Sequence, residues 1–151
     1  MGVHGLTLGS DPFVTREVRR WIERLVLESG FADSDARDLA VAFGETCANV
    51  HRHAYGGRCD GRVEIRIAID DDKVVVTVKH DGKPFDPAAY ASPDLRRLSE
   101  SGYGVYLIKS LMDSVTFEGA LSGGRIVLVK RKTPTAARGE TVGSGGRHAE
   151  K

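Results

Sequence analysis

Two glycines, Gly102 and Gly104, come just before a segment of helical spacing that runs from Val105 to Met112. Glycines at the start of a helix leave backbone N–H groups accessible beside the positive end of the helix dipole, and this arrangement favours phosphate. Glycines are also common in loops that begin ordinary helices, so the pair by itself leaves that alternative open. The chain lacks the six-residue dinucleotide fingerprint and the Gly-Lys-Ser/Thr of a P-loop, which excludes those two modes of nucleotide binding.

A stripe of polar residues, Glu45, Asn49 and His53, recurs every four positions in a long helical segment between Asp33 and Gly56. Successive members lie about 40° apart around an α-helix, so the three side chains are expected on one face. Polar residues at this spacing are also common on solvated helix faces, and these residues alone leave that alternative open. Apolar residues mark a second face, the expected core face: Ala36, Leu39, Ala40, Phe43, Cys47 and Val50.

The rest of the chain supplies the elements that would position these residues. In chain order we expect an edge strand at 3–8, a helix capped by Ser10 or Asp11 and closed by Gly30, the long helix capped by Asp33 or Ser34, strands at 62–69 and 73–80, a helix from Val105, and strands at 114–118 and 125–132. Strands joined by short turns favour a mixed, mostly antiparallel sheet with helices on one face, an α+β two-layer sandwich. Three consecutive aspartates, 70–72, are predicted to form a turn and not a calcium loop, because the Gly and distal Glu of such a loop are absent.

Length and composition are those of one ordinary soluble domain. The chain has 151 residues and a formal net charge of +1, which gives no overall field toward nucleic acid or an anionic membrane. Cys47 and Cys59 form neither a disulfide framework nor a metal-ligand cluster, which indicates a reducing, cytoplasmic setting. No apolar run is long enough to span a bilayer, and no secretory signal is apparent at the N-terminus. We expect a domain at 1–132 and a disordered tail at 133–151, where almost nothing is available to bury.

Three motifs occur together in the order and spacing of the N, G1 and G2 boxes of the GHKL (Bergerat-fold, histidine-kinase-like) ATPases. They are Glu45-x-x-x-Asn49-x-x-x-His53-Ala54-Tyr55, then His80-Asp81-Gly82-x-Pro84-Phe85-Asp86-Pro87, then Gly102-Tyr103-Gly104-Val105. From roughly Leu8 to Arg131 the chain resembles this family. It is most similar to anti-sigma-factor serine-protein kinases of the RsbW/SpoIIAB type.

The resemblance implies a role for each matching position. Asn49 would hold Mg²⁺ through its amide oxygen, and Glu45 would act as general base on the attacking hydroxyl or orient it. Gly82 would let the backbone pass close to the adenine of ATP, and Gly102 and Gly104 would hinge a lid and donate N–H groups to the phosphates. The remaining cofactor-binding positions that the resemblance implies are His53, His80, Pro84, Phe85, Tyr103, Val105 and Lys109. For His53, packing with Tyr55 is an equal alternative, and Lys109 also fits an ordinary surface lysine.

One position departs from the family pattern. The family usually has Asp two residues before the glycine of the G1 box, where the carboxylate accepts a hydrogen bond from the adenine amino group, whereas this chain has His80. Strand alternation is expected to place His80 on the face of Val74, Val76 and Val78. A neutral imidazole has one acceptor nitrogen and can still take the amino proton in the right tautomer.

Two functions therefore follow from the resemblance. The first is an anti-sigma factor that sequesters a sigma factor and uses ATP and Mg²⁺ to phosphorylate a Ser or Thr of an anti-anti-sigma (STAS) partner. The second is a protein-binding regulator of the same fold with weakened nucleotide binding, because of His80. A sensor histidine kinase is disfavoured, since no helix ahead of Glu45 offers a phospho-acceptor histidine. A homodimer through Phe13 or Trp21 stays open, although both residues also fit the core. We expect no direct contact with nucleic acid or membrane.

Overall fold

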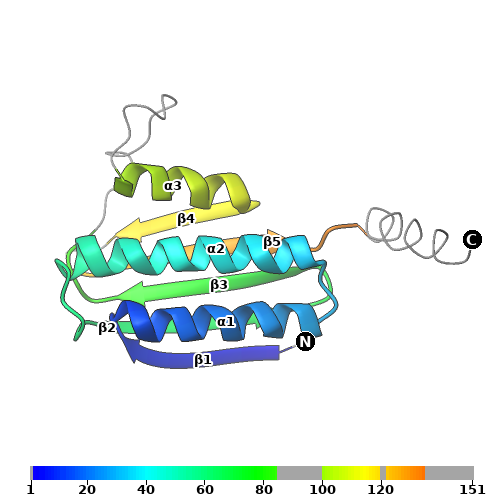
Figure 1. The fold of residues 1–151 in the computed structure, drawn as a ribbon, viewed down its shortest axis with the longest axis horizontal. Helices are drawn as coiled ribbons and strands as arrows, with labels where there is room; N and C mark the ends of the chain where they lie inside the picture. Colours follow the sequence, from blue (N-terminus) through cyan, green and yellow to red (C-terminus); the bar gives the residue numbers. More distant parts are fainter. Residues whose placement is uncertain (1, 85–99, 120–121, 135–151) are drawn as a thin grey trace, which may run out of the picture.

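The computed structural model describes residues 2–84, 100–119 and 122–134 (Figure 1). The elements in chain order are β1 (Gly2–Gly9), α1 (Pro12–Glu28), α2 (Asp33–Asn49), a π-helical turn η1 (Val50–Ala54), β2 (Arg62–Ile69), β3 (Lys73–His80), α3 (Glu100–Leu111), β4 (Ser114–Gly119) and β5 (Gly124–Arg131). The predicted elements are all present, and the largest difference at a strand or α-helix start is at α3, which begins at Glu100 and not at the predicted Val105. The sequence also favours a short helical turn around Leu95–Leu98, and this segment lies outside the described residues.

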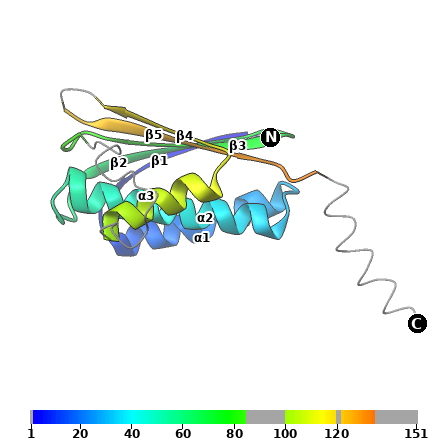
Figure 2. The ribbon, with the colours of Figure 1, turned by 90° about the horizontal axis from the view of Figure 1, so that it is seen from above.

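The five strands form one sheet in the order β1-β2-β3-β5-β4. All four pairings are antiparallel, so the α+β prediction is confirmed and the expected mixed character of the sheet is wrong. The three helices lie together on one face of this sheet, with α2 between α1 and α3 (Figures 1 and 2). β1 is an edge strand, as its weak alternation predicts.

The core lies between α2 and the central strands. The predicted apolar face of α2 is buried throughout, with Leu39 and Phe43 fully inaccessible. Across from it, alternate residues of β2 and β3 are buried, among them Ile67 and Val76, which are direct partners in the register. Burying a side chain of this size stabilises the fold by about 1.5–3 kcal/mol, so this layer fixes how α2 lies over the sheet.

Helix ends follow the sequence at α1 and depart from it at α2. Asp11 caps α1 by accepting a hydrogen bond from the Phe13 N–H at 2.9 Å, and Gly30 follows the helix with a φ of 89°. The prediction that Asp33 or Ser34 caps α2 is wrong, because the N-cap is Ala32 and has no side-chain hydrogen bond. The acidic residues of the first turn instead stabilise that end through the helix dipole. α2 also ends as an α-helix at Asn49 and continues as the π-helical turn η1, whereas the sequence predicts one uniform helix.

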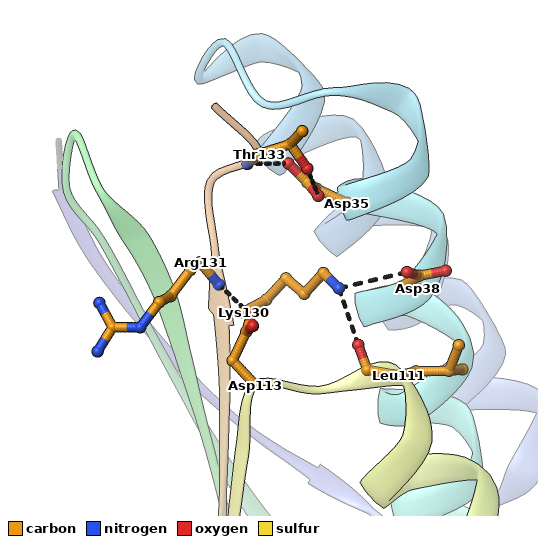
Figure 3. A network of polar contacts seen from close by, with 7 residues as sticks. All are labelled: Asp35, Asp38, Leu111, Asp113, Lys130, Arg131 and Thr133. Atoms are coloured by element: carbon orange, nitrogen blue, oxygen red, sulfur yellow. Dashed lines mark hydrogen bonds and ion pairs between the residues drawn. The ribbon is translucent and has the colours of Figure 1, made fainter. Parts of the chain in front are cut away.

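A polar network ties the exit of β5 to the helical layer (Figure 3). Lys130 Nζ donates to the carbonyl oxygen of Leu111, the last residue of α3, at 2.9 Å and lies 3.3 Å from Asp38 Oδ2 on α2. The Thr133 N–H donates to Asp35 Oδ2 at 2.8 Å, and Asp35 is buried. Thr133 was predicted to begin the tail and is instead held against α2. Residues 135–151 lie outside the described chain, so a disordered tail there stays a prediction.

We expect Lys130→Met to lower the free energy of unfolding by about 1–2 kcal/mol, because the carbonyl of Leu111 and the carboxylate of Asp38 lose a partly buried cation. Arg20→Met is the matched control, since the one ion pair of Arg20 among the described residues is exposed and joins it to Glu17, and its expected effect is under about 0.5 kcal/mol. Urea denaturation followed by circular dichroism measures both. Equal effects of the two substitutions would show that the network does not stabilise the fold.

Candidate functional site

The polar stripe of α2 and the glycine pair meet at one place. A Cβ built on Gly104 would stand 2.9 Å from Glu45 Oε2 and 3.8 Å from Asn49 Oδ1. The backbone of α3 therefore comes directly against the carboxylate and the amide, with no side chain between them. The predicted base, the predicted metal ligand and one predicted lid glycine are thus brought together. Gly102 and Gly104 belong to α3, which begins at Glu100, so the predicted turn before the helix is wrong.

The three residues of the polar stripe differ in how deeply their side chains are buried. Asn49 is only 4% exposed, whereas Glu45 and His53 are half-buried. A solvated helix face is therefore excluded for Asn49. Its Oδ1 accepts a hydrogen bond from Arg52 Nη2 at 3.3 Å, and its Nδ2 has no hydrogen-bond partner among the described residues. A buried amide with unused hydrogen-bonding capacity is a common feature of a site that awaits a ligand or a water molecule.

Tyr55 connects the end of η1 to the end of β3 through hydrogen bonds of its hydroxyl. The sequence predicted only that Tyr55 could pack against His53. Its hydroxyl lies 2.7 Å from Asp81 Oδ1, accepts a hydrogen bond from the Asp81 N–H at 3.1 Å and also bonds the carbonyl oxygen of Arg62. The carbonyl oxygen of Ala54 accepts from the Lys83 N–H at 2.8 Å. These bonds fix the start of the G1 motif relative to the stripe of α2.

Gly82 is required by the packing of the chain itself. A Cβ at this position would stand 2.4 Å from the carbonyl oxygen of Ala54 and 2.8 Å from the ring of Tyr55. Contacts under 3.0 Å to backbone atoms are not relieved by a side-chain rotation. The expected role of Gly82 beside an adenine stays a prediction, and the structure adds a reason for glycine that needs no ligand.

His80 lies on the inward face of β3, as the strand alternation predicts, and is 5% exposed. Its ring makes an edge contact with the ring of Tyr55, with centroids 6.1 Å apart. His80 Nδ1 has no hydrogen-bond partner among the described residues. It borders a small cavity of about 10 Å³, which is room for about one water molecule. The lining residues are Thr46, Asn49, Val50, Ala54, His80, Phe117 and Ile126.

The polar atoms beside the cavity match the hydrogen-bonding edge of a nucleobase, but the volume of the cavity is too small to hold the base. Two buried polar atoms beside it, Asn49 Nδ2 and His80 Nδ1, have no described partner and so match a ligand with hydrogen-bonding groups. Pockets for small ligands occupy about 300–1,000 Å³, far more than the space present. A base therefore enters only if the cavity widens, and the half-buried Phe117 is the large side chain at its border.

Burial dominates the pKa shifts of the site. Burial lowers the pKa of His80 below its ordinary value of 6.5, and the nearby charge of Asp81 opposes this shift. The pKa of His53 is also lowered, by burial and by the positive charges of Arg52 and Lys83. Arg52 and Lys83 thus form a cationic group beside the neutral ring of His53 at the end of η1, as a phosphate would require. Burial raises the pKa of the Cys47 thiol to about 12, which excludes this thiol as a nucleophile at neutral pH.

We expect the free energy of unfolding to fall as the pH drops from 7.5 to 5.5, partly through His80. A lowered pKa in the folded state means that the unfolded chain binds the proton first, so the contribution of His80 is present above pH 6.5 and is lost as the pH falls through the folded-state value. His80→Gln removes this titration. Denaturant unfolding at the two pH values should give a smaller pH effect for the variant than for the unaltered protein, and an equal effect would contradict the assignment.

A larger groove lies on the other side of Glu45, between α1 and α2. Its volume is about 350 Å³. The lining residues are Pro12, Thr15, Arg16, Arg19, Val41, Gly44, Glu45, Cys47, Ala48, His51 and Arg52. Three arginines make the groove strongly basic, and Glu45 is its one acidic member. Sequence reasoning missed the contribution of α1, although Arg16 and Arg19 are three residues apart and so share a helix face.

The other predicted cofactor-binding residues differ in where the structure places their side chains. Tyr103 is 49% exposed, and Lys109 is exposed on the same helix. The side chain of Val105 is instead buried in the core, 1% exposed. Pro84 is exposed, and Phe85 lies outside the described residues. The roles of these residues in cofactor binding therefore stay predictions.

Three further features concern a dimer contact, membranes and metals. Phe13 is 64% exposed and stays available for a homodimer contact, whereas Trp21 packs against the core. Among residues 2–84, 100–119 and 122–134, no helix is both long and apolar enough to cross a membrane. In the same ranges no three His, Cys, Asp or Glu side chains cluster as a metal site.

Comparison with known proteins agrees with this arrangement. Residues 9–130 match the family described as the histidine kinase-like ATPase domain. The chain belongs to this family. It is 29% identical to the serine-protein kinase RsbW of Bacillus velezensis over 83% of this chain and 82% of that protein. It is 31% identical to the serine-protein kinase RsbW of Bacillus subtilis (strain 168) over 75% of each chain.

A solved structure supports the fold of this family member. The crystal structure of the RsbU and RsbW domains of Rv1364c from Mycobacterium tuberculosis matches with a TM-score of 0.66 and 19% sequence identity. The match covers 89% of this chain and 34% of that longer chain. The two-layer sandwich predicted from the sequence is therefore confirmed.

Proposed function

We propose that this family member is an anti-sigma factor with ATP-dependent serine/threonine-protein kinase activity toward an anti-anti-sigma partner with a STAS domain. The observation that carries the proposal is the close approach of Gly104 to Glu45 Oε2 and Asn49 Oδ1. It places a carboxylate, an amide oxygen and the glycine-rich start of α3 around one point. The names of the curated relatives, serine-protein kinases, support the same activity.

Each residue of the site has a task in phosphoryl transfer. ATP supplies the phosphoryl group, and Mg²⁺ neutralises the charge that develops on the phosphate oxygens. Asn49 would hold the metal ion through Oδ1, which its buried position already orients. Glu45 would orient the hydroxyl of the acceptor serine and accept its proton. The backbone N–H groups near Gly104 and the cationic group at the end of η1 would hold the phosphates.

The basic groove between α1 and α2 is the proposed docking place of the acceptor protein. Glu45 lines this groove and also faces Gly104, so a hydroxyl presented from the groove reaches the carboxylate without crossing the core. Arg16, Arg19 and Arg52 give the groove a positive potential that would attract an acidic surface and speed association. The groove thus joins recognition of the partner to the proposed chemistry.

We expect Arg16→Glu to weaken binding of the STAS partner by about 10- to 100-fold, because charge reversal in the groove places like charges across the contact. Arg20→Glu is the control, since Arg20 is also exposed on α1 but does not line the groove. Titration calorimetry with the two variants measures the difference. If both variants weaken binding equally, the effect comes from the net charge of the protein. If Arg16→Glu does not weaken binding, the groove is not part of the interface.

A direct test of the kinase proposal mixes the protein with ATP, Mg²⁺ and a STAS-domain protein encoded in the same genome. Mass spectrometry should find one phosphoryl group on a Ser or Thr of that partner, and the product should disappear when EDTA removes the metal. Absence of phosphorylated partner, with both proteins folded and bound to each other, would refute the proposal.

A second candidate is a protein-binding regulator with little or no nucleotide binding. The observation in its favour is the cavity beside His80, which is too small for a base. Calorimetry with ATP and ADP separates the two candidates. Micromolar binding favours the kinase, and no binding at millimolar nucleotide favours the regulator, which would still sequester a sigma factor.

A further inference from the structure

The side-chain oxygen of Asn49 already has a positive charge beside it. Arg52 Nη2 donates to Asn49 Oδ1 at 3.3 Å, and Arg52 is half-buried where Asn49 is buried. Glu45 is close to the same oxygen, because a Cβ on Gly104 would be 2.9 Å from Glu45 Oε2 and 3.8 Å from Asn49 Oδ1. A carboxylate and an amide oxygen that face one point favour a cation there. In the structure, the guanidinium of Arg52 supplies a positive charge at this oxygen.

A guanidinium and Mg²⁺ would compete for Asn49 Oδ1. Mg²⁺ lies about 2.1 Å from its oxygen ligands. Because Arg52 Nη2 is 3.3 Å from the same oxygen, the nitrogen and the metal ion would be at most about 5.4 Å apart, whichever lone pair the metal ion takes. At such a distance in a partly buried place, repulsion between a single and a double positive charge outweighs one hydrogen bond. Arg52 must therefore leave Asn49 when Mg²⁺ binds.

The surroundings of Arg52 allow this exchange. Arg52 also lines the groove between α1 and α2, whose volume is about 350 Å³, so its long side chain has space to turn into. The positive charges of Arg52 and Lys83 both lower the pKa of His53, which places the two cations near one ring. Phosphate oxygens at that place would accept the hydrogen bonds that the guanidinium withdraws from Asn49. Mg²⁺ alone brings no such acceptors, so the exchange favours a metal ion that arrives with a nucleotide.

We propose that Arg52 holds the place of the metal ion at Asn49 Oδ1 in the nucleotide-free protein, and that Mg²⁺ binds with its nucleotide only by displacing this guanidinium. This inference rests on the proposed nucleotide binding. Arg52 is then a positioning residue with two effects. It keeps the amide oxygen of Asn49 oriented before the ligand binds, and it opposes binding of the metal ion without phosphate.

Nucleotide affinity with and without Mg²⁺ tests this in the full-length protein. Fluorescence anisotropy of an ADP that carries a fluorophore on its ribose gives the dissociation constant in excess EDTA and in excess Mg²⁺. The ratio of the two constants is the factor by which Mg²⁺ tightens binding, and chelation of Mg²⁺ by free nucleotide affects every variant equally. We expect this factor to be about 5- to 20-fold larger for Arg52→Met than for the unaltered protein, because the metal ion no longer displaces a charge-assisted hydrogen bond.

Arg19→Met is the matched control. Arg19 lines the same groove, but its stem lies over Gly44, where a Cβ would be 3.3 Å from Arg19 Cδ. Its loss removes one positive charge without touching Asn49, so the Mg²⁺ factor should change by less than about twofold. Arg52→Gln replaces Arg52→Met if the latter does not fold.

Two results would overturn the inference and leave the kinase proposal standing. The first is a Mg²⁺ factor that is unchanged or smaller when Arg52 is replaced. The second is an equal rise for the Arg52 and Arg19 variants, which would make the effect one of groove charge and not of the contact with Asn49. If the unaltered protein binds no nucleotide at millimolar concentration, with or without Mg²⁺, the inference and the proposed nucleotide site are both wrong.

Discussion

Glu45→Gln is expected to reduce phosphoryl transfer to the STAS partner by about 10²- to 10⁴-fold, because an amide cannot accept the proton of the attacking hydroxyl. Gln keeps the length of Glu and can still lie against Gly104, where Glu45 Oε2 now stands. Nucleotide affinity should therefore change by less than about threefold, since the carboxylate is assigned to the transition state and not to ground-state binding. Single-turnover kinetics with radiolabelled ATP measures the transfer rate, and calorimetry measures the affinity.

Two results would contradict this assignment. A rate within tenfold of the unaltered protein would show that Glu45 is not the base. A loss of rate that follows an equal loss of nucleotide affinity would make Glu45 a binding residue. Glu23→Gln is the matched control, because Glu23 is also half-buried on a helix but lies outside the groove and the cavity.

Gly82→Ala is expected to lower the free energy of unfolding by about 1–3 kcal/mol, the usual cost of forcing a methyl group into a packed region. The new Cβ would stand 2.4 Å from the carbonyl oxygen of Ala54. That oxygen accepts the hydrogen bond of the Lys83 N–H, so it cannot move away without breaking the contact between η1 and the end of β3. Urea denaturation measures the loss.

Gly119→Ala provides the control for this substitution. A Cβ at Gly119 meets nothing within 4 Å, and its φ is not in the left-handed region. Its effect should stay within about 1 kcal/mol and can be stabilising, because alanine reduces the entropy of the unfolded chain. If the two substitutions have equal effects, the close packing at Gly82 does not matter for stability.

The sequence carries most of the information about the fold. Period-two alternation in 62–69 and 73–80 predicts β2 and β3, and the apolar face of α2 is buried as predicted. Strands joined by short turns predict the sandwich, and the joint occurrence of three motifs predicts that Gly104, Glu45 and Asn49 belong to one site. These features depend on local patterns, which a sequence displays directly.

Features that depend on tertiary contacts were missed for physical reasons. The π-helical turn at Val50–Ala54 has the same polar and apolar spacing as an α-helix, so no pattern distinguishes it. Arg16 and Arg19 belong to the groove only because α1 packs beside α2. The capping prediction at Asp33 failed because carboxylates stabilise the first turn as well as the N-cap. The bonds of the Tyr55 hydroxyl to Asp81 and Arg62 require the folded chain.

The order of the strands has a consequence for how the protein reaches its active form. β2–β3 and β4–β5 are hairpins between neighbours in the chain, whereas β3–β5 joins segments far apart. Short hairpins close in microseconds, and long-range pairings form more slowly. α3 lies between β3 and β4 in the chain, inside the loop that the β3–β5 pairing closes, so we expect Gly104 to meet Glu45 late in folding, once the two hairpins have joined. A newly synthesised chain would then complete the proposed phosphate-binding corner only after its local hairpins have formed.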